Sequence, residues 1–255
     1  MKIVTFNLRN VWMKDGINAF VHRAGSILDK IDTEAPDIIC FQECIEKLRD
    51  FLTAHLPDYD FHYHGRNDDF CGEGLAFALK KSTVELISTD RFWLSPTPFV
   101  PGSRFEDQSQ YPRICQVIMA RTKADNKIFR VYNNHLDHIS DKARILGITT
   151  VMEKIKEDFE RYNCPVFILG DFNATPDSEP IAYCNGYEAF PITDLTDSLE
   201  ITFHAYGKFE EACKIDYIYC DRETAKNPHS ISVWDDELAG IYLSDHYPIC
   251  LSIEL

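Results

Sequence analysis

The sequence predicts an α/β fold in which two β-sheets pack together and helices cover their outer faces. Short apolar runs recur along the whole chain, and runs of this kind are typical of buried strands. Only three longer segments have the apolar spacing of amphipathic helices, so strands outnumber helices. Strand and helix signals alternate at first, whereas the middle of the chain is almost entirely strand-like, which favours two sheets over one.

The first part of the chain alternates between strand and helix. Two segments place apolar residues at helical spacing, and each of them follows a short apolar run. In chain order, we expect a strand over 4–6 that leads to Asn7, a helix over 16–33, a strand over 38–42 that leads to Glu43, and a helix over 44–54.

The middle of the chain is rich in β-branched and aromatic residues. Asp125-Asn126 lies between the last two apolar runs of this part and is typical of a turn. We expect strands here over 74–79, 84–88, 114–121 and 128–134.

The longest helix signal covers 140–161, where Ser140 is a candidate N-cap. Prolines and glycines make 174–210 loop-rich. No repeat or linker divides the chain, so one domain over 1–255 is expected. The remaining strands are expected over 165–170, 215–220, 229–234 and 248–255.

Charge and cysteine content narrow the classes of function. The 26 basic and 41 acidic residues give a net charge of -15, which does not favour nucleic acid as a partner, although a local basic patch would leave that partner open. The nine cysteines are odd in number and scattered, which favours free thiols in a reducing compartment. With no signal peptide and no apolar stretch of about 20 residues, we expect a cytoplasmic protein without a membrane span. The sequence does not set the oligomeric state.

Four apolar runs end in a residue that can hold a metal ion or a phosphate. These residues are Asn7, Glu43, His135 and Asp171. Ligands of α/β proteins collect just outside the strand ends, so side chains distant in sequence can converge there. Glu43 and Asn7 would suit Mg²⁺, with Mn²⁺ as the alternative ion. The simpler interpretation of Glu43 is a strand-end acid that reaches solvent.

Two further motifs carry acid–base chemistry. Asp171 could orient or deprotonate a water while the Asn173 amide binds a phosphate oxygen, although an Asp-Asn turn would also explain this pair. Asp245-His246 could supply a ligand and a proton donor, or form a solvated loop. Asp216 lies inside an apolar strand and needs a partner, for which a histidine is well suited.

Six segments taken in order resemble the endonuclease/exonuclease/phosphatase superfamily, which includes DNase I-like nucleases and inositol-phosphate phosphatases. The segments 111–113 and 134–138 also resemble the branch of CCR4-type deadenylases and many small bacterial proteins. The six segments are Phe6-Asn7, Gln42-Glu43, Asn134-His135, Gly170–Asn173, Ile215–Tyr217 and Ser244–His246.

The resemblance implies a four-layer α/β sandwich, with two mixed sheets face to face and helices outside. It implies that Asp171 activates the water, Asn173 holds the phosphate and His135 binds a phosphate oxygen. The remaining roles it implies are Glu43 as the main metal ligand, Asn7 and Asp245 in the metal shell, and His246 as charge stabiliser or proton donor, oriented by Asp216.

Substrate contacts are less well defined. Many members carry Thr where this chain has Asn134, and Asn133 precedes it, so substrate positioning is expected to differ. The candidate substrate-binding residues are Asn134, Arg113 and Phe203, with Trp93 and Trp234 as further aromatics that core packing would equally explain.

The pattern predicts a Mg²⁺-dependent phosphoesterase that cleaves a P–O bond by in-line attack of water. Its substrate would be a small phosphorylated molecule or a phosphodiester. A nuclease acting on DNA or RNA is the first alternative. A non-catalytic binding protein on the same scaffold is the second, although such a protein should have lost part of the polar set.

Overall fold

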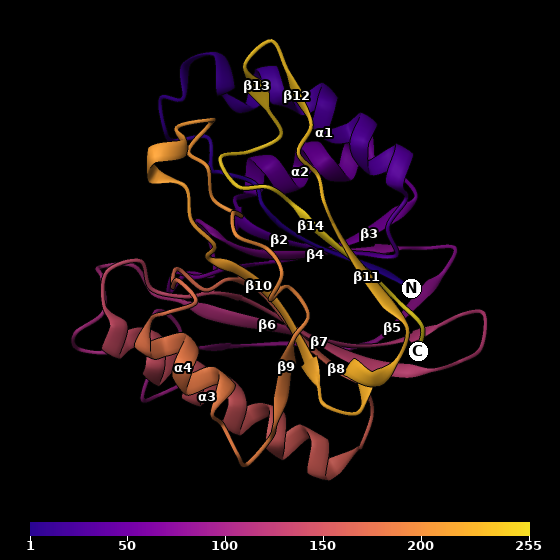
Figure 1. Ribbon diagram of the computed structural model, residues 1–255, viewed down its shortest axis with the longest axis vertical. Helices are drawn as coiled ribbons and strands as arrows, with labels where there is room; N and C mark the ends of the chain where they lie inside the picture. Colours follow the sequence, from indigo (N-terminus) through magenta and orange to yellow (C-terminus); the bar gives the residue numbers. More distant parts are fainter.

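The computed structural model describes residues 1–255 and consists of four layers (Figure 1). Two six-stranded sheets pack face to face. In spatial order the first sheet contains β11 (His229–Val233), β14 (Ile249–Ile253), β1 (Lys2–Asn7), β2 (Ile38–Cys44), β4 (Gly74–Lys80) and β3 (Tyr59–Gly65). The second sheet contains β5 (Val84–Trp93), β6 (Ile114–Thr122), β7 (Ile128–His135), β8 (Val166–Asp171), β10 (Asp216–Asp221) and β9 (Ile192–Asp194).

Helices cover the outer face of each sheet, which confirms the predicted four-layer sandwich (Figure 1). The short pair β12 (Glu237–Leu238) and β13 (Ile241–Tyr242) forms a separate hairpin beside the helices of the first sheet. The helices are α1 (Phe20–Glu34) and α2 (Glu46–His55) on the first sheet, and α3 (Asp141–Arg161) and α4 (Glu179–Asn185) on the second.

Apolar side chains fill the three spaces between these layers. Strand residues alternate between the two faces, so Ile3 and Ile38 enter the space between the sheets while Val4 and Ile39 pack under α1 and α2. On the other side, Met152 and Ile155 of α3 pack against the second sheet. Sheets buried on both faces need continuous apolar runs, which is why these strands could be recognised in the sequence.

Each sheet contains one parallel pair at its centre. β1 runs parallel to β2, and β7 runs parallel to β8, whereas the other neighbours are antiparallel. The carboxyl ends of these four strands therefore lie at the same end of the sandwich. This arrangement brings Asn7, Glu43, His135 and Asp171 to one edge.

A polar contact ties the two sheets together below that edge. Asn133 of β7 is fully buried and donates from Nδ2 to the carbonyl oxygens of Phe41, at 3.1 Å, and Ala76, at 3.3 Å. Its Oδ1 accepts a 2.8 Å hydrogen bond from Nε2 of the equally buried Gln42. Because buried polar groups without partners are costly, these bonds favour a single register of one sheet on the other.

One local expectation was wrong. The helix expected over 16–33 is divided, because residue Ala19 is extended and only a short 3₁₀ turn, Gly16–Asn18, precedes α1. The region 174–210 is loop-rich as expected, with only the short α4 and β9 inside it.

Other expectations agree with the structure. Ser140 caps α3, accepting a 3.2 Å hydrogen bond from the amide of Ala143. All nine cysteines are free thiols, and most of them are buried. None of the helices combines the length and the apolar composition that crossing a bilayer requires.

A candidate active site at the strand ends

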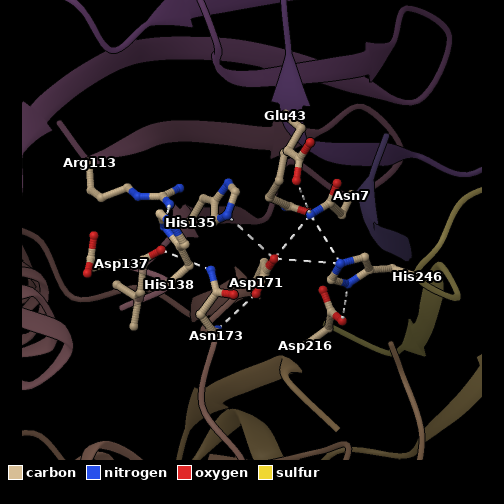
Figure 2. A network of polar contacts seen from close by, with 12 residues as sticks. Asn7, Glu43, Arg113, His135, Asp137, His138, Asp171, Asn173, Asp216 and His246 are labelled. Carbon is tan, nitrogen blue, oxygen red and sulfur yellow. Dashed lines mark hydrogen bonds and ion pairs between the residues drawn. The ribbon is translucent and has the colours of Figure 1, made fainter. Parts of the chain in front are cut away.

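Asn7 lies at the centre of the polar edge, at the end of β1 (Figure 2). Its Nδ2 donates to Oε1 of Glu43 at 3.3 Å and to Oδ2 of Asp171 at 3.1 Å, and it lies 3.5 Å from Nε2 of His246. Only 2% of Asn7 is exposed. One buried amide therefore connects groups contributed by both sheets and by the loop before β14.

The backbone around Glu43 is irregular in a way that directs its side chain to this edge. The pairing of β2 with β4 shifts register between Phe41 and Cys44, and Glu43 itself has a φ of 53°. Left-handed backbone is costly for a residue with a side chain, and such strain is concentrated at functional sites. Oε2 of Glu43 accepts hydrogen bonds from the backbone amide of Asn10 at 2.9 Å and from Nδ2 of Asn10 at 2.8 Å.

Asp171 ends β8 and is almost completely buried. Its Oδ1 accepts a 2.8 Å hydrogen bond from the backbone amide of Asn173, which has a φ of 49°. Nδ2 of Asn173 donates to the carbonyl of Leu136 at 3.0 Å. The bond from the Asn173 amide is the one that the Asp-Asn turn interpretation predicts. Burial, followed by the charge of Asp216, raises the pKa of Asp171 to about 7, so it can accept a proton near neutral pH.

His246 and Asp216 form a buried ion pair, with 2.8 Å between Nδ1 and Oδ2. Burial alone lowers the pKa of His246, but the Asp216 carboxylate and its hydrogen bond, together with the charges of Asp171 and Asp245, outweigh burial and raise the pKa to about 10. The ring is therefore an imidazolium at neutral pH. Oγ1 of Thr202 accepts from the amide of Asp216 at 3.0 Å, and the ring of Phe203 packs edge-on against His246 with 5.0 Å between centroids. Asp216 thus has the histidine partner that its burial required.

His135 ends β7 and faces Asp171, with 3.5 Å between Nε2 and Oδ2. Burial, followed by the charges of Arg113 and Arg66, holds the pKa of His135 well below its usual range. The ring is therefore neutral, in contrast to His246. A neutral imidazole can donate one hydrogen bond to an anion without carrying charge.

Asp245 lies beside this group and pairs with Arg9, with 3.4 Å between Oδ2 and Nη1. Oδ1 accepts a 3.1 Å hydrogen bond from Oγ of Ser244. Burial raises the pKa of Asp245, and the charge of Glu43 acts in the same direction. Asp245 is therefore buried and not the solvated loop residue that the simpler interpretation assumed.

The side-chain set fits a divalent cation. Burial raises the pKa of Asp171 and of Asp245, and the charge of Glu43 acts on both in the same direction, so a bound cation would offset this repulsion. Ligand atoms of Asp171, Asp216 and His246 all lie within 4.8 Å of one another. Asp216 and His246 already bind each other, so a cation held by these three residues would compete with that ion pair.

Some predicted site residues lie elsewhere. Asn134 points away from the edge, because side chains of a strand alternate and its neighbour Asn133 faces the other sheet. It lines an apolar cavity under α3 together with Leu136 and Ile148, so substrate contact does not match its position. Trp93 and Trp234 are buried in the core. Arg113 is also buried, but it lies beside His135 and donates to Nδ1 of His138 at 2.9 Å (Figure 2).

Three residues of this region were missed in the sequence. Asn10 holds Glu43, Glu73 accepts a 3.0 Å hydrogen bond from Nδ2 of Asn10, and Arg66 forms an ion pair with Glu73. Glu73 lies between two glycines. The one available signal was position: Asn10 follows the end of β1 by a few residues, and Arg66 directly follows β3.

Comparisons with known proteins agree with the four-layer fold and with the polar site at the strand ends. A model of the endonuclease/exonuclease/phosphatase family matches residues 4–246. The chain is 28% identical to the endonuclease/exonuclease/phosphatase from Bacteroides vulgatus, whose crystal structure superposes with a TM-score of 0.90 over 100% of this chain and 98% of that one.

Two further relatives cover nearly the whole chain. The Bacteroides thetaiotaomicron mannosyl-6-phosphatase is 25% identical, with a TM-score of 0.85 and full coverage of both chains. An uncharacterised protein of Acanthamoeba polyphaga mimivirus is 23% identical over 91% of each chain. Since the family model spans nearly the whole sequence and members of this family hydrolyse phosphoric esters, the chain belongs to the endonuclease/exonuclease/phosphatase family and is a phosphoric ester hydrolase.

Proposed function

We propose that this protein is a Mg²⁺-dependent phosphoesterase that cleaves a P–O bond by in-line attack of water on a small phosphorylated molecule. The observation that carries this proposal is the convergence of Glu43, Asp171 and His246 around the Asn7 amide. Carboxylate oxygens are the preferred ligands of Mg²⁺, and Mn²⁺ would accept the same set.

The protonation state of each residue suits it to a different role in hydrolysis. Asp171, with its pKa near neutrality, would take the proton of the attacking water. The imidazolium of His246 would stabilise negative charge on the phosphoryl oxygens or protonate the leaving oxygen. Asp216 holds His246 in orientation and in its charged form. Glu43, with Asn7 and Asp245 beside it, would hold the cation, which supplies charge neutralisation at the phosphate.

Neutral donors would position the phosphate. His135 is close enough to Asp171 to reach the same phosphoryl group, and the Asn173 side chain keeps one amide proton free after donating to Leu136. The Phe203 ring beside His246 would form one wall of the site. In-line attack depends chiefly on such positioning and on charge neutralisation.

The charge of the chain supports a small substrate over a nucleic acid. A net charge of -15 opposes the approach of a polyanion, whereas a single phosphate needs only the local field of the site. The mannosyl-6-phosphatase among the relatives is named for a phosphorylated sugar and not for a nucleic acid, which supports the same choice. We therefore place nuclease activity second.

A metal-dependent substrate panel tests the proposal. Purified protein would be assayed with Mg²⁺, with Mn²⁺ and with EDTA on a sugar monophosphate, on bis(p-nitrophenyl) phosphate and on single-stranded DNA and RNA. We expect metal-dependent release of phosphate from the small ester, and loss of at least about 100-fold in Asp171→Ala. Equal activity in the wild type and in Asp171→Ala, or activity in EDTA, would refute it. Faster cleavage of DNA or RNA would favour the nuclease.

A further inference from the structure

Arg23 is a completely buried arginine near the start of α1, which lies beside the β12–β13 hairpin (Figure 1). Its guanidinium donates four hydrogen bonds, and all four acceptors are backbone carbonyl oxygens. Nε donates to Asn18 at 2.6 Å, Nη1 to Leu243 at 2.5 Å, and Nη2 to Leu8 at 3.0 Å and Arg9 at 3.2 Å. One buried side chain therefore joins three separate segments of the chain.

Two of these segments carry residues of the candidate active site. The acceptors at 8–9 directly follow Asn7, and Leu243 lies two residues before Asp245. In the site itself, Nδ2 of Asn7 lies 3.5 Å from Nε2 of His246. Arg23 therefore connects the backbones of the same two segments whose side chains meet in the site.

The sheet ladder does not make this connection. β1 pairs with β14 only as far as Thr5 and Ile249, and the site residues of both segments lie past that pair. Backbone bonds tie the second segment to a different loop, because the carbonyl oxygen of Asp245 accepts from the amides of 204–205 at 2.9 and 3.1 Å. Arg23 therefore supplies a link between the chain after β1 and the chain before β14.

The chemistry of the guanidinium suits such a link. Burial lowers the pKa of Arg23, and the charges of Asp245 and Asp15 only partly offset this effect. Removing a charge from water is costly, and here four carbonyl acceptors compensate for that cost. A planar guanidinium fixes the directions of its N–H groups, which a flexible lysine ammonium does not. Arg23 can therefore hold the backbone segments around it in one geometry.

We propose that Arg23 is a positioning residue of the hydrolysis, which sets the placement of Asn7 relative to the segment that carries Asp245 and His246. This inference rests on the proposed phosphoesterase function. Arg23 is completely buried, so it acts through these residues and contacts neither the substrate nor the cation. Displacements of about 1 Å in an active site can reduce the rate about 100-fold. Loss of Arg23 should therefore lower kcat and weaken cation binding, with little effect on KM.

The first test measures cation binding without turnover, by isothermal titration of the full chain with Mn²⁺. The control is Arg130→Gln, because Arg130 is also buried and donates to the carbonyl of Tyr162 at 2.7 Å, but lies at the opposite end of β7 from His135. We expect Mn²⁺ to bind at least about tenfold more weakly to Arg23→Gln, the scale of losing a group that orients metal ligands, and with wild-type affinity to Arg130→Gln.

The sign of this change separates geometry from charge. Removing a positive charge near carboxylates would by itself strengthen cation binding. Weaker binding to Arg23→Gln would therefore come from misplaced ligands, whereas equal or tighter binding would overturn the positioning role.

The second test measures kcat and KM in Mg²⁺ on p-nitrophenyl phosphate and bis(p-nitrophenyl) phosphate, at a temperature at which circular dichroism shows every variant folded. For Arg23→Gln we expect kcat to fall at least about tenfold, with KM within about threefold of the wild type. Arg23→Lys keeps the charge but not the planar fork, so its loss should be smaller, and it replaces Arg23→Gln in both tests if that variant does not fold. Arg130→Gln should lose stability in urea and keep the wild-type kcat.

The outcomes distinguish the two proposals. Wild-type kcat in a folded Arg23 variant that is destabilised as much as Arg130→Gln would leave Arg23 a purely stabilising role and overturn the inference alone. A wild type that neither binds Mn²⁺ nor hydrolyses either ester would refute the proposed function and, with it, the positioning role.

Discussion

Gly170 gives the most direct test of how the fold positions the site. It precedes Asp171 in β8 and pairs with Asn134 of β7. Its φ of 131° is rarely adopted by residues with a side chain. A Cβ at this position would lie 2.0 Å from the carbonyl oxygen of Asn134. Gly170→Ala would therefore bring a side chain into contact with backbone, which no change of rotamer can relieve.

The cost of Gly170→Ala follows from this geometry. Holding alanine in an unfavourable backbone region costs about 1–3 kcal/mol. Separating the two strands by the ångström or so needed to clear the contact would weaken neighbouring ladder hydrogen bonds, at about 1 kcal/mol each. We expect a total loss of about 3–5 kcal/mol in the free energy of unfolding, in the upper range for point mutants. Asp171 would move with the strand, so hydrolysis should fall as well.

Gly25 provides a matched control. It lies in α1, its φ is not positive, and a Cβ there would meet nothing within 4 Å. Gly25→Ala should therefore stabilise the protein by about 0.5–1 kcal/mol, the difference in helix propensity. Equilibrium urea unfolding, followed by tryptophan fluorescence, would measure both variants. The reasoning fails if Gly170→Ala lies within 1 kcal/mol of the wild type while Gly25→Ala behaves as expected.

Three further predictions concern the sheet contact, pH and catalysis. Asn133→Ala leaves buried groups of the opposite sheet without partners, so urea unfolding should show a loss of about 2–4 kcal/mol; a change under 1 kcal/mol would contradict the inter-sheet role. Burial, followed by the charge of Arg91, lowers the pKa of His64 to about 4, while its Nδ1 accepts from Arg91 at 3.0 Å. As pH falls, His64 is therefore protonated in the unfolded state before it is protonated in the folded state. The contribution of neutral His64 to the free energy of unfolding is complete above pH 6.5 and is lost as pH falls toward 4. Between pH 8 and pH 5 it amounts to about 1–2 kcal/mol, and His64→Gln should remove that part of the pH dependence of unfolding. Finally, His246→Ala should fold normally by circular dichroism and lose at least about 100-fold in kcat; near-normal turnover would exclude His246 from the mechanism.

The sequence predicted the central strands and the residues at their ends, because each of these depends on one local rule. Apolar runs buried on both faces mark the central strands, and a polar residue directly after such a run lies at the strand end. Asn7, His135 and Asp171 each end one strand of the two central parallel pairs, and Glu43 is the penultimate residue of the fourth, so these side chains meet. Asp216 was recognisable for a different reason, since a carboxylate inside a strand requires a partner.

The sequence was less informative about which face of a strand a side chain occupies and about contacts between distant loops. Asn133 and Asn134 are identical in chemistry, and only the two-residue period of β7 decides which of them faces the other sheet and which faces α3. Asn10, Arg66 and Glu73 lie in irregular segments, and their contacts depend on how three loops pack at the same edge. No local pattern specifies such packing, because each contact joins residues far apart in the sequence.

The two arginines beside His135 bear on how an acidic protein selects an anionic substrate. The charge of -15 repels any polyanion at long range, but salt at physiological concentration screens that field within about 8 Å. Arg66 and Arg113 are buried, so their attraction is short-ranged and little screened. A compact phosphate ester would reach this short-ranged field directly, whereas a long strand would place its remaining phosphates against a chain of strongly negative net charge. The same charge distribution therefore supports the proposed small phosphorylated substrate over a nucleic acid.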